Sequence, residues 1–160
     1  MKAIILNDTH FGHKADSPLV MDYFMEFFKN QLFPYMKENN IQNLFHLGDL
    51  FDRRKYINFK TLNRVRSEFL DPLQEMNVRC HVICGNHDTF YKNTNKVNSL
   101  DELVSHYSNW SVYSEPTEIE LSTGCVALMP WINPENEEVA ANFLNETQCS
   151  VLLGHLELYG

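Results

Sequence analysis

Cysteine pairs, long apolar runs and positive charge are all scarce in this sequence. The four cysteines form no Cys-x-x-Cys pair, which argues against a zinc site or a disulfide: Cys80, Cys84, Cys125 and Cys149. Three of them stand in apolar, strand-like runs, so we expect reduced thiols packed in the core. No stretch approaches the ~18 consecutive apolar residues of a membrane span, and no small-residue cleavage pattern follows the N-terminus. We therefore expect a soluble, cytoplasmic protein with no membrane partner.

Basic residues are outnumbered by acidic ones. The chain has 13 lysines and arginines against 21 aspartates and glutamates, giving a formal net charge of −8. This balance argues against indiscriminate binding to nucleic acid, although an average says nothing about the charge of one face. The 160 residues, 44% of them hydrophobic, are enough for one domain with its own hydrophobic core and too few for two such domains. We expect a single domain.

Short apolar runs alternate with segments of helical spacing. We expect strands at residues 2–8, 43–49 and 79–86, followed by helices at 17–39, 59–76 and 99–107 respectively. Three strand–helix units in series predict an α/β fold with a parallel sheet. A second sheet is expected to begin at Trp110, with strands at 110–114, 117–122, 125–132 and 149–155 and a helix at 133–146.

Polar side chains follow the apolar strands where each strand ends. Asp8 and His10 close the first strand, Asp49 and Asp52 the second, the tetrapeptide at 85–88 the third, and Gly154-His155 the last. Because the carboxyl ends of strands in open α/β sheets form ligand sites, we expect these segments to converge on one crevice. Carboxylates, imidazoles and an amide oxygen suit Mn²⁺, Mg²⁺, Fe or Zn²⁺. The sequence therefore predicts a metal centre.

Four motifs carry a resemblance to a known family. Asp-x-His, Gly-Asp-x-x-Asp, Gly-Asn-His-Asp and Gly-His, in this order, resemble the signature of the calcineurin-like metallophosphoesterases. The stretches "DTHFG", "GDLFDRRK", "GNHDTFYKN" and "GHLELYG" are similar to the nuclease subunits of the SbcCD type, above all to the recombination endonuclease subunit of tailed phages. Phe51, Arg54 and Asp88 depart from the motifs of the protein serine/threonine phosphatases.

The resemblance implies a fold and its extent. The expected architecture is a four-layer α-β-β-α sandwich, incomplete at the C-terminus. Residues 1–160 would be the N-terminal part of one nuclease domain, without its capping and C-terminal regions. Family members carry a further Gly-His-x-His motif beyond the position of "GHLE" (residues 154–157). Within "GHLE" itself, Glu157 stands where a second histidine would complete a Gly-His-x-His pattern. We therefore expect a chain truncated before its final histidines and, by itself, poorly active as a nuclease.

The resemblance also assigns metal ligands. Two divalent ions are implied, with Mn²⁺ expected and Mg²⁺, Fe or Zn²⁺ as alternatives. Asp8 and His10 would hold the first ion, Asn86 and His155 the second, and Asp49 would bridge both. A shared carboxylate suits two cations ~3.5 to 4 Å apart, a spacing that activates a water and holds a phosphodiester for in-line attack.

Further polar residues surround this set. His87, next to a ligand without being one, would be the catalytic histidine that stabilises charge or protonates the leaving oxygen. Asp88 would orient the imidazole of His87 or cap its loop, and Asp52 would take a supporting or capping role. His46 and His81 lie inside strands, so we expect them to pack in the core with one satisfied nitrogen.

Cations follow the second motif directly. Arg53, Arg54 and Lys55 are expected to form a rim for a DNA backbone, and His13 to touch the substrate. More distant cations would extend the rim: Lys60, Arg64, Arg66, Lys92 and Lys96. An alternative for Arg64 and Arg66 is a solvated helix face.

These features lead to one preferred function and two alternatives. By resemblance, the chain would be a DNA exo/endonuclease subunit of recombination and double-strand-break repair, acting by a two-metal-activated water. It would work in the host cytoplasm if phage-encoded, as a homodimer with an SbcC-like ATPase subunit. The alternatives are a non-catalytic fragment that retains DNA or partner binding, and a phosphodiesterase of small substrates.

Overall fold

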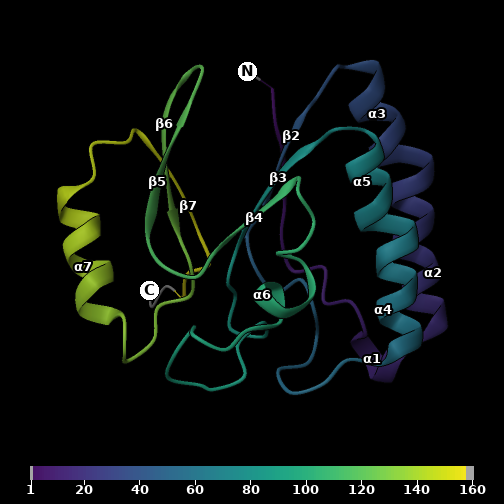
Figure 1. The fold of residues 1–160 in the computed structure, drawn as a ribbon, viewed down its shortest axis with the longest axis horizontal. Helices are drawn as coiled ribbons and strands as arrows, with labels where there is room; N and C mark the ends of the chain where they lie inside the picture. The colour runs from purple at the N-terminus through teal and green to yellow at the C-terminus, as the bar shows by residue number, and fades with distance from the viewer. Residues whose placement is uncertain (1, 158–160) are drawn as a thin grey trace.

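A computed structural model describes residues 2–157 as four layers. Helix α7 (Glu137–Glu146), a sheet of β5 to β7, a sheet of β1 to β4 and the helices α2 to α5 follow one another across the molecule (Figure 1). The α-β-β-α arrangement implied by the sequence is confirmed. No helix in this part of the chain is long and apolar enough to cross a membrane.

The first sheet is parallel throughout. Its strands β1 (Ile4–Leu6), β2 (Asn43–His46), β3 (Arg79–Ile83) and β4 (Trp110–Tyr113) lie in chain order. The prediction of a parallel sheet is confirmed, but the expected start of the second sheet at Trp110 is wrong. β4 pairs with β3 because the short helix α6 (Ser99–Leu103) leads the chain back to that edge.

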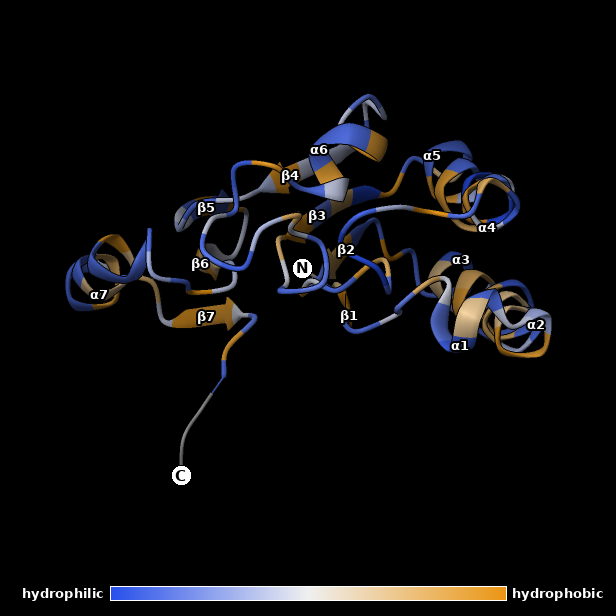
Figure 2. Cartoon of the chain, turned by 90° about the horizontal axis from the view of Figure 1, so that it is seen from below, coloured by the Kyte–Doolittle hydropathy of each residue, from blue (hydrophilic) through white to orange (hydrophobic). Residues whose placement is uncertain are grey.

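The second sheet is mixed. β5 (Thr117–Leu121) and β6 (Gly124–Met129) form an antiparallel hairpin whose turn is Ser122-Thr123, and β7 (Val151–Gly154) runs parallel to β6. A small apolar cluster joins the two sheets and includes Phe45, Ile83 and Leu128. In Figure 2 the hydrophobic colouring of β2, β3 and β7 marks these inner layers. The end of β7 is thus held beside the ends of β2 and β3.

The helical layer consists of two long rods, each with a π-helical turn inside. One rod is α2 (Pro18–Phe27), η1 (Phe28–Leu32) and α3 (Phe33–Glu38); the other is α4 (Phe59–Val65), η2 (Arg66–Leu70) and α5 (Asp71–Glu75). Both π turns precede a proline, Pro34 or Pro72, which lacks the amide N–H that a regular α-helical hydrogen bond needs. The sequence predicts each rod as one helix and gives no sign of these turns.

The main core lies between these rods and the first sheet, and it anchors the loop after β1. Phe11, 2% exposed, packs on Phe28 and Phe69 with ring centroids 6.1 and 5.4 Å away. Its amide donates to the carbonyl oxygen of Leu50 at 2.9 Å. The loop after β1 is therefore fastened both to the core and to the loop after β2, and it continues into the short left-handed turn α1 (His13–Asp16).

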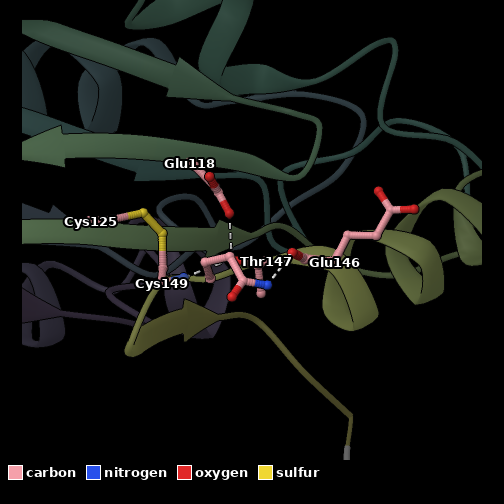
Figure 3. Close-up of a disulfide and its surroundings, with 6 residues drawn as sticks. Glu118, Cys125, Glu146, Thr147 and Cys149 are labelled. Carbon is pink, nitrogen blue, oxygen red and sulfur yellow. Dashed lines mark hydrogen bonds between the residues drawn. A yellow bond between two sulfur atoms is a disulfide. The ribbon is translucent and has the colours of Figure 1, made fainter.

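The cysteines divide into two kinds. Cys80 and Cys84 are buried free thiols, as expected, and burial raises the pKa of both. The expectation of reduced thiols is wrong for Cys125 and Cys149, which form a disulfide (Figure 3). β6 and β7 pair in parallel, so the residues at their N-terminal ends meet, with Cα atoms 5.0 Å apart. Sequence patterns alone do not reveal which strands are neighbours.

Candidate metal centre

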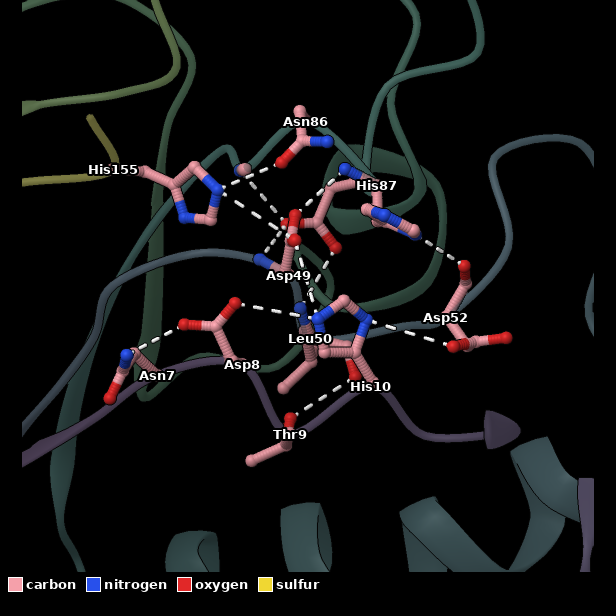
Figure 4. Close-up of polar contacts among 12 residues, drawn as sticks. Asn7, Asp8, Thr9, His10, Asp49, Leu50, Asp52, Asn86, His87 and His155 are labelled. Carbon is pink, nitrogen blue, oxygen red and sulfur yellow. Dashed lines mark hydrogen bonds and ion pairs between the residues drawn. The ribbon is translucent and has the colours of Figure 1, made fainter. Parts of the chain in front are cut away.

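The polar residues predicted from the four motifs meet at the carboxyl ends of the strands (Figure 4). One segment follows β1, one β2, one β3 and one β7, so both sheets contribute to the site. The convergence predicted from strand ends is confirmed. The residues brought together are Asp8, His10, Asp49, Asn86, His87 and His155.

Two groups of metal-binding side chains share one carboxylate. In the first group, ligand atoms of His10, Asp49 and His87 lie within 4.8 Å of one another. In the second, atoms of Asp8, Asp49 and His155 do the same. The carboxylate of Asp49, with 3% of the residue exposed, is common to both. This sharing is the geometry expected of a bridging ligand, although the partition differs from the sequence-based one, which places Asp8 with His10.

Strained backbone holds the shared carboxylate and its neighbours in place. Asp8, His10 and Asp49 have φ of 52°, 41° and 54°, in the left-handed region that non-glycine residues seldom occupy. Such conformations cost on the order of 1–3 kcal/mol each and cluster at functional sites. The amide of His10 donates to the carbonyl oxygen of Asp49 at 3.0 Å, which fixes the two loops together. The strain therefore supports a functional role for these turns.

Two glycines allow the segments to approach closely. Gly48 has φ of 92°, and a Cβ on it would lie 2.7 Å from Nδ1 of His155. A Cβ on Gly85 would overlap the carboxylate and the amide nitrogen of Asp49. No larger residue fits at either position without displacing a candidate ligand. The absence of a side chain at both positions thus permits the strand ends to pack closely.

The proton positions on His155 favour a bound cation. Its Nδ1 lies 2.8 Å from the carbonyl oxygen of Leu47, which can only accept, so Nδ1 carries the proton. The other nitrogen, Nε2, faces two oxygens, Oδ1 of Asn86 at 3.0 Å and Oδ2 of Asp49 at 3.7 Å. A neutral imidazole would point a lone pair at these acceptors. A divalent cation among the three atoms removes that conflict, so the donor set fits a metal ion.

His10 and His87 lie edge to face, with ring centroids 4.7 Å apart. Nδ1 of His87 lies 2.6 Å from the backbone carbonyl oxygen of Asp52, so this nitrogen is the donor and Nε2 is the free one. Nε2 of His10 lies 3.4 Å from both Asp8 and Asp49, while its buried Nδ1 has no hydrogen-bond partner among the described residues. The carbonyl groups that orient His87 and His155 have no sequence signal, because any residue supplies one.

Asp88 ties two loops together. Its buried carboxylate accepts four backbone amides: Asp49 at 2.7 Å, Leu50 at 3.0 Å, Phe51 at 3.3 Å and Gly85 at 3.0 Å. Burial, outweighing these hydrogen bonds, raises its pKa to about 7. The expected contact with the imidazole of His87 is not made, because both oxygens are occupied. Loop capping, the alternative left open by the sequence, describes its contacts.

The residues flanking the centre are largely engaged within the chain. Nδ1 of His13 lies 3.0 Å from Oδ1 of Asp52, at the exposed side of the site. The guanidinium of Arg53 donates to Asp16 at 2.7 Å. That of Arg54 donates to Oγ1 of Thr89 at 3.0 Å. Local sequence patterns do not reveal these acceptors, which lie 35 to 37 residues away along the chain.

The cations further along are only partly free. Arg64, which is half-buried, binds Asp22 and Glu68, and Lys96 binds Glu135. Lys55 is exposed, and its Nζ lies 5.5 Å from the ring centroid of Phe90.

The remaining strand histidines pack in the core. His46 is completely buried, with Nε2 3.1 Å from Oγ1 of Thr9 and Nδ1 without a partner among the described residues. Burial lowers its pKa to about 3. Nδ1 of His81 pairs with the hydroxyl of Tyr113 at 2.9 Å. The prediction of packed histidines with one satisfied nitrogen is confirmed for His46.

The sequence and the fold are similar to those of known proteins. Residues 1–160 match the calcineurin-like phosphoesterase family. The chain is 35% identical over its whole length to exonuclease subunit 1 of Enterobacteria phage T4, and it spans 47% of that curated relative. A crystal structure of Pseudomonas putida nuclease MPE, at 22% identity, shares the fold with a TM-score of 0.50 over 79% of this chain and 52% of that one. The chain therefore belongs to the calcineurin-like phosphoesterases.

Proposed function

We propose that the chain carries the active site of a divalent-metal-dependent DNA nuclease. The observation that carries this proposal is the buried Asp49 carboxylate, which belongs to two groups of metal-binding side chains at once. The phage relative named an exonuclease subunit supports DNA as the substrate. The proposed role is exo/endonucleolytic cleavage in recombination and double-strand-break repair, with two ions, Mn²⁺ being the expected one.

Each residue of the centre then has a defined task. Asp8 and His10 would hold one ion, Asn86 and His155 the other, and Asp49 both; Nε2 of His10 lies 3.4 Å from both Asp8 and Asp49, so Asp8 is within reach of either group. Two divalent ions at such a centre lower the pKa of a water and neutralise charge on the phosphodiester. Nδ1 of His87 donates to the carbonyl oxygen of Asp52, which leaves Nε2 free, and in its protonated form the imidazole would donate a proton from Nε2 to the leaving oxygen. Asp88 holds the loops that carry Asp49 and His87 at their mutual distance.

Substrate and partner contacts complete the proposal. His13, Arg53, Arg54 and Lys55 lie on the segments that extend from the centre, where a DNA backbone would pass. The basic side chains contribute a positive field even while they bind neighbours in the chain. The relative's name describes a subunit, which supports a partner subunit. We propose an SbcC-like ATPase as that partner, and a homodimer of the nuclease.

Hydrolysis assays test this function. The purified protein is incubated with Mn²⁺ and, separately, with EDTA, on linear duplex DNA, single-stranded DNA and bis(p-nitrophenyl) phosphate. We expect weak Mn²⁺-dependent cleavage of DNA by this chain, which is lost in Asp49→Ala and in His87→Ala. The surface variant Asp22→Ala is the control. Cleavage that persists in EDTA or in Asp49→Ala would contradict the proposal, and hydrolysis of the nitrophenyl ester without cleavage of DNA would favour the small-substrate alternative.

A further inference from the structure

A second concave site lies next to the metal centre. It is a pocket of about 190 Å³ between the loop after β2, the loop after β3 and helix α6. In Figure 1 these loops and α6 gather at the carboxyl edge of the first sheet. Phe51, at the inner wall of the pocket, is two residues from Asp49. The pocket therefore opens on the same segments that carry the metal-binding residues.

The walls of this pocket combine aromatic rings with cations. Phe90 and Tyr56 line it, together with Arg53 and Lys55. Nζ of Lys55 lies 5.5 Å from the centroid of Phe90, and the guanidinium carbon of Arg53 lies 5.1 Å from that of Tyr56. Tyr56 is 66% exposed, so its ring is not part of the hydrophobic core. Aromatic rings interleaved with cations are the components of a site for single-stranded nucleic acid.

Polar residues also line the pocket. Oγ of Ser99 is buried yet has no hydrogen-bond partner among the described residues, and Ser99 lines the pocket. Glu102 adds an exposed carboxylate to the same lining. A hydroxyl and a carboxylate can meet the donors and acceptors on the edge of a nucleobase.

The pocket is held rigidly to the metal centre. The amide of Ser99 donates to the carbonyl oxygen of Asp88 at 2.8 Å, and that of Phe90 donates to Val97 at 2.8 Å. Asp88 in turn binds the amide of Asp49. Both walls of the pocket are thus fastened to the residue that positions the shared carboxylate. A ligand in the pocket would lie at a fixed position relative to a phosphodiester at the centre.

We propose that this pocket receives one unpaired nucleobase of the DNA strand whose phosphodiester lies at the metal centre. The proposal rests on the nuclease function and names its substrate class, strands with unpaired bases. The volume is below the about 300–1,000 Å³ of sites for drug-sized ligands, which suits one small planar group. A base stacked and paired in a duplex cannot enter, so frayed ends and single strands bind better than blunt duplex.

Binding of two matched strands tests the pocket independently of catalysis. Fluorescence anisotropy in EDTA compares a labelled single strand with a strand of the same length whose residues are all abasic. The variants are Phe90→Ala and, because its ring is exposed and leaves the core intact, Tyr56→Ala. Tyr35→Ala, 54% exposed on α3, is the aromatic control. Since a base–aromatic stack is worth about 1–3 kcal/mol, each pocket variant should bind the intact strand roughly fivefold or more weakly.

The outcomes separate this proposal from the nuclease function. We expect wild type and Tyr35→Ala to prefer the intact strand and both pocket variants to lose that preference, with the abasic strand unaffected. A wild-type protein without such a preference, or variants that keep it, would overturn the pocket assignment even if Mn²⁺-dependent cleavage is observed. Competition by deoxyadenosine monophosphate at the strand's own concentration would assign the pocket to free nucleotides and overturn it as well.

Discussion

Replacing Asp88 by asparagine should weaken the contacts that hold the loops of the metal centre together. The carboxylate accepts two amides on each oxygen, from Asp49 and Gly85 on Oδ2 and from Leu50 and Phe51 on Oδ1. Asparagine keeps the shape and one acceptor oxygen, but its amide group is a donor. In Asp88→Asn, the side-chain NH₂ group replaces one of the two carboxylate oxygens. The two backbone amides that bind that oxygen then face another donor in a buried site.

The cost follows from the number of amides left without an acceptor. Each buried donor that loses its partner costs roughly 1–3 kcal/mol, so two of them cost roughly 2–6 kcal/mol before the loops relax. We expect a net loss of about 3 kcal/mol in the free energy of unfolding, a large part of the ~5–15 kcal/mol typical of a domain. Because the substitution also allows the loops after β2 and β3 to separate, the affinity for metal should fall together with the stability.

Urea unfolding in EDTA measures this loss without any contribution from bound metal. The midpoint should fall while the m-value stays the same. Asp22→Asn is the matched control, because Asp22 is exposed and pairs only with Arg64, so its loss should cost at most ~1 kcal/mol. If Asp88→Asn is as stable as Asp22→Asn, Asp88 does not hold the loops together.

Two further predictions concern pH and salt. His46 has its pKa lowered to about 3 by burial, so below its unfolded value of ~6.5 only the unfolded chain takes up a proton. The raised pKa of Asp88 acts in the opposite direction and is common to wild type and His46→Gln, so between pH 7.5 and pH 5 the wild type should lose about 2 kcal/mol of stability relative to His46→Gln. Urea unfolding at both pH values in EDTA checks this, and an equal loss in His46→Gln would show that another group is responsible. Lys55 is the exposed cation beside the pocket, so Lys55→Ser should flatten the dependence of log K on log salt by about 0.7 for a single strand. Anisotropy titrations from low to high salt measure the slope, and an unchanged slope would remove Lys55 from the DNA contacts.

The sequence predicts the location of the site better than its internal contacts. Asp8, Asp49 and His155 are recognisable because a polar residue after an apolar strand falls at the carboxyl edge of a sheet. The sequence does not give the direction in which each side chain points. Asp88 shows this: a carboxylate next to a histidine suggests a contact between them, yet the turn directs it to backbone amides. Local spacing cannot reveal which amides lie nearby in the fold.

Contacts between segments that are far apart along the chain also could not be predicted from the sequence. The disulfide of Cys125 and Cys149 depends on β6 and β7 being neighbours, a pairing that no local pattern encodes. The addition of β4 to the first sheet likewise depends on where α6 directs the chain. The aromatic and basic residues of the pocket, Tyr56 and Phe90 among them, are visible in the sequence as interleaved types, but only the fold brings the two loops together.

The sharing of Asp49 between two metal ions is tested most directly by calorimetric titration of Mn²⁺ into the metal-free protein, its Asp49→Ala variant and its His87→Ala variant. We predict two ions per wild-type chain, the loss of tight binding at both sites in Asp49→Ala, and near wild-type binding in His87→Ala, with circular dichroism confirming that each variant is folded. Equal Mn²⁺ affinity and stoichiometry in wild type and Asp49→Ala would contradict the account.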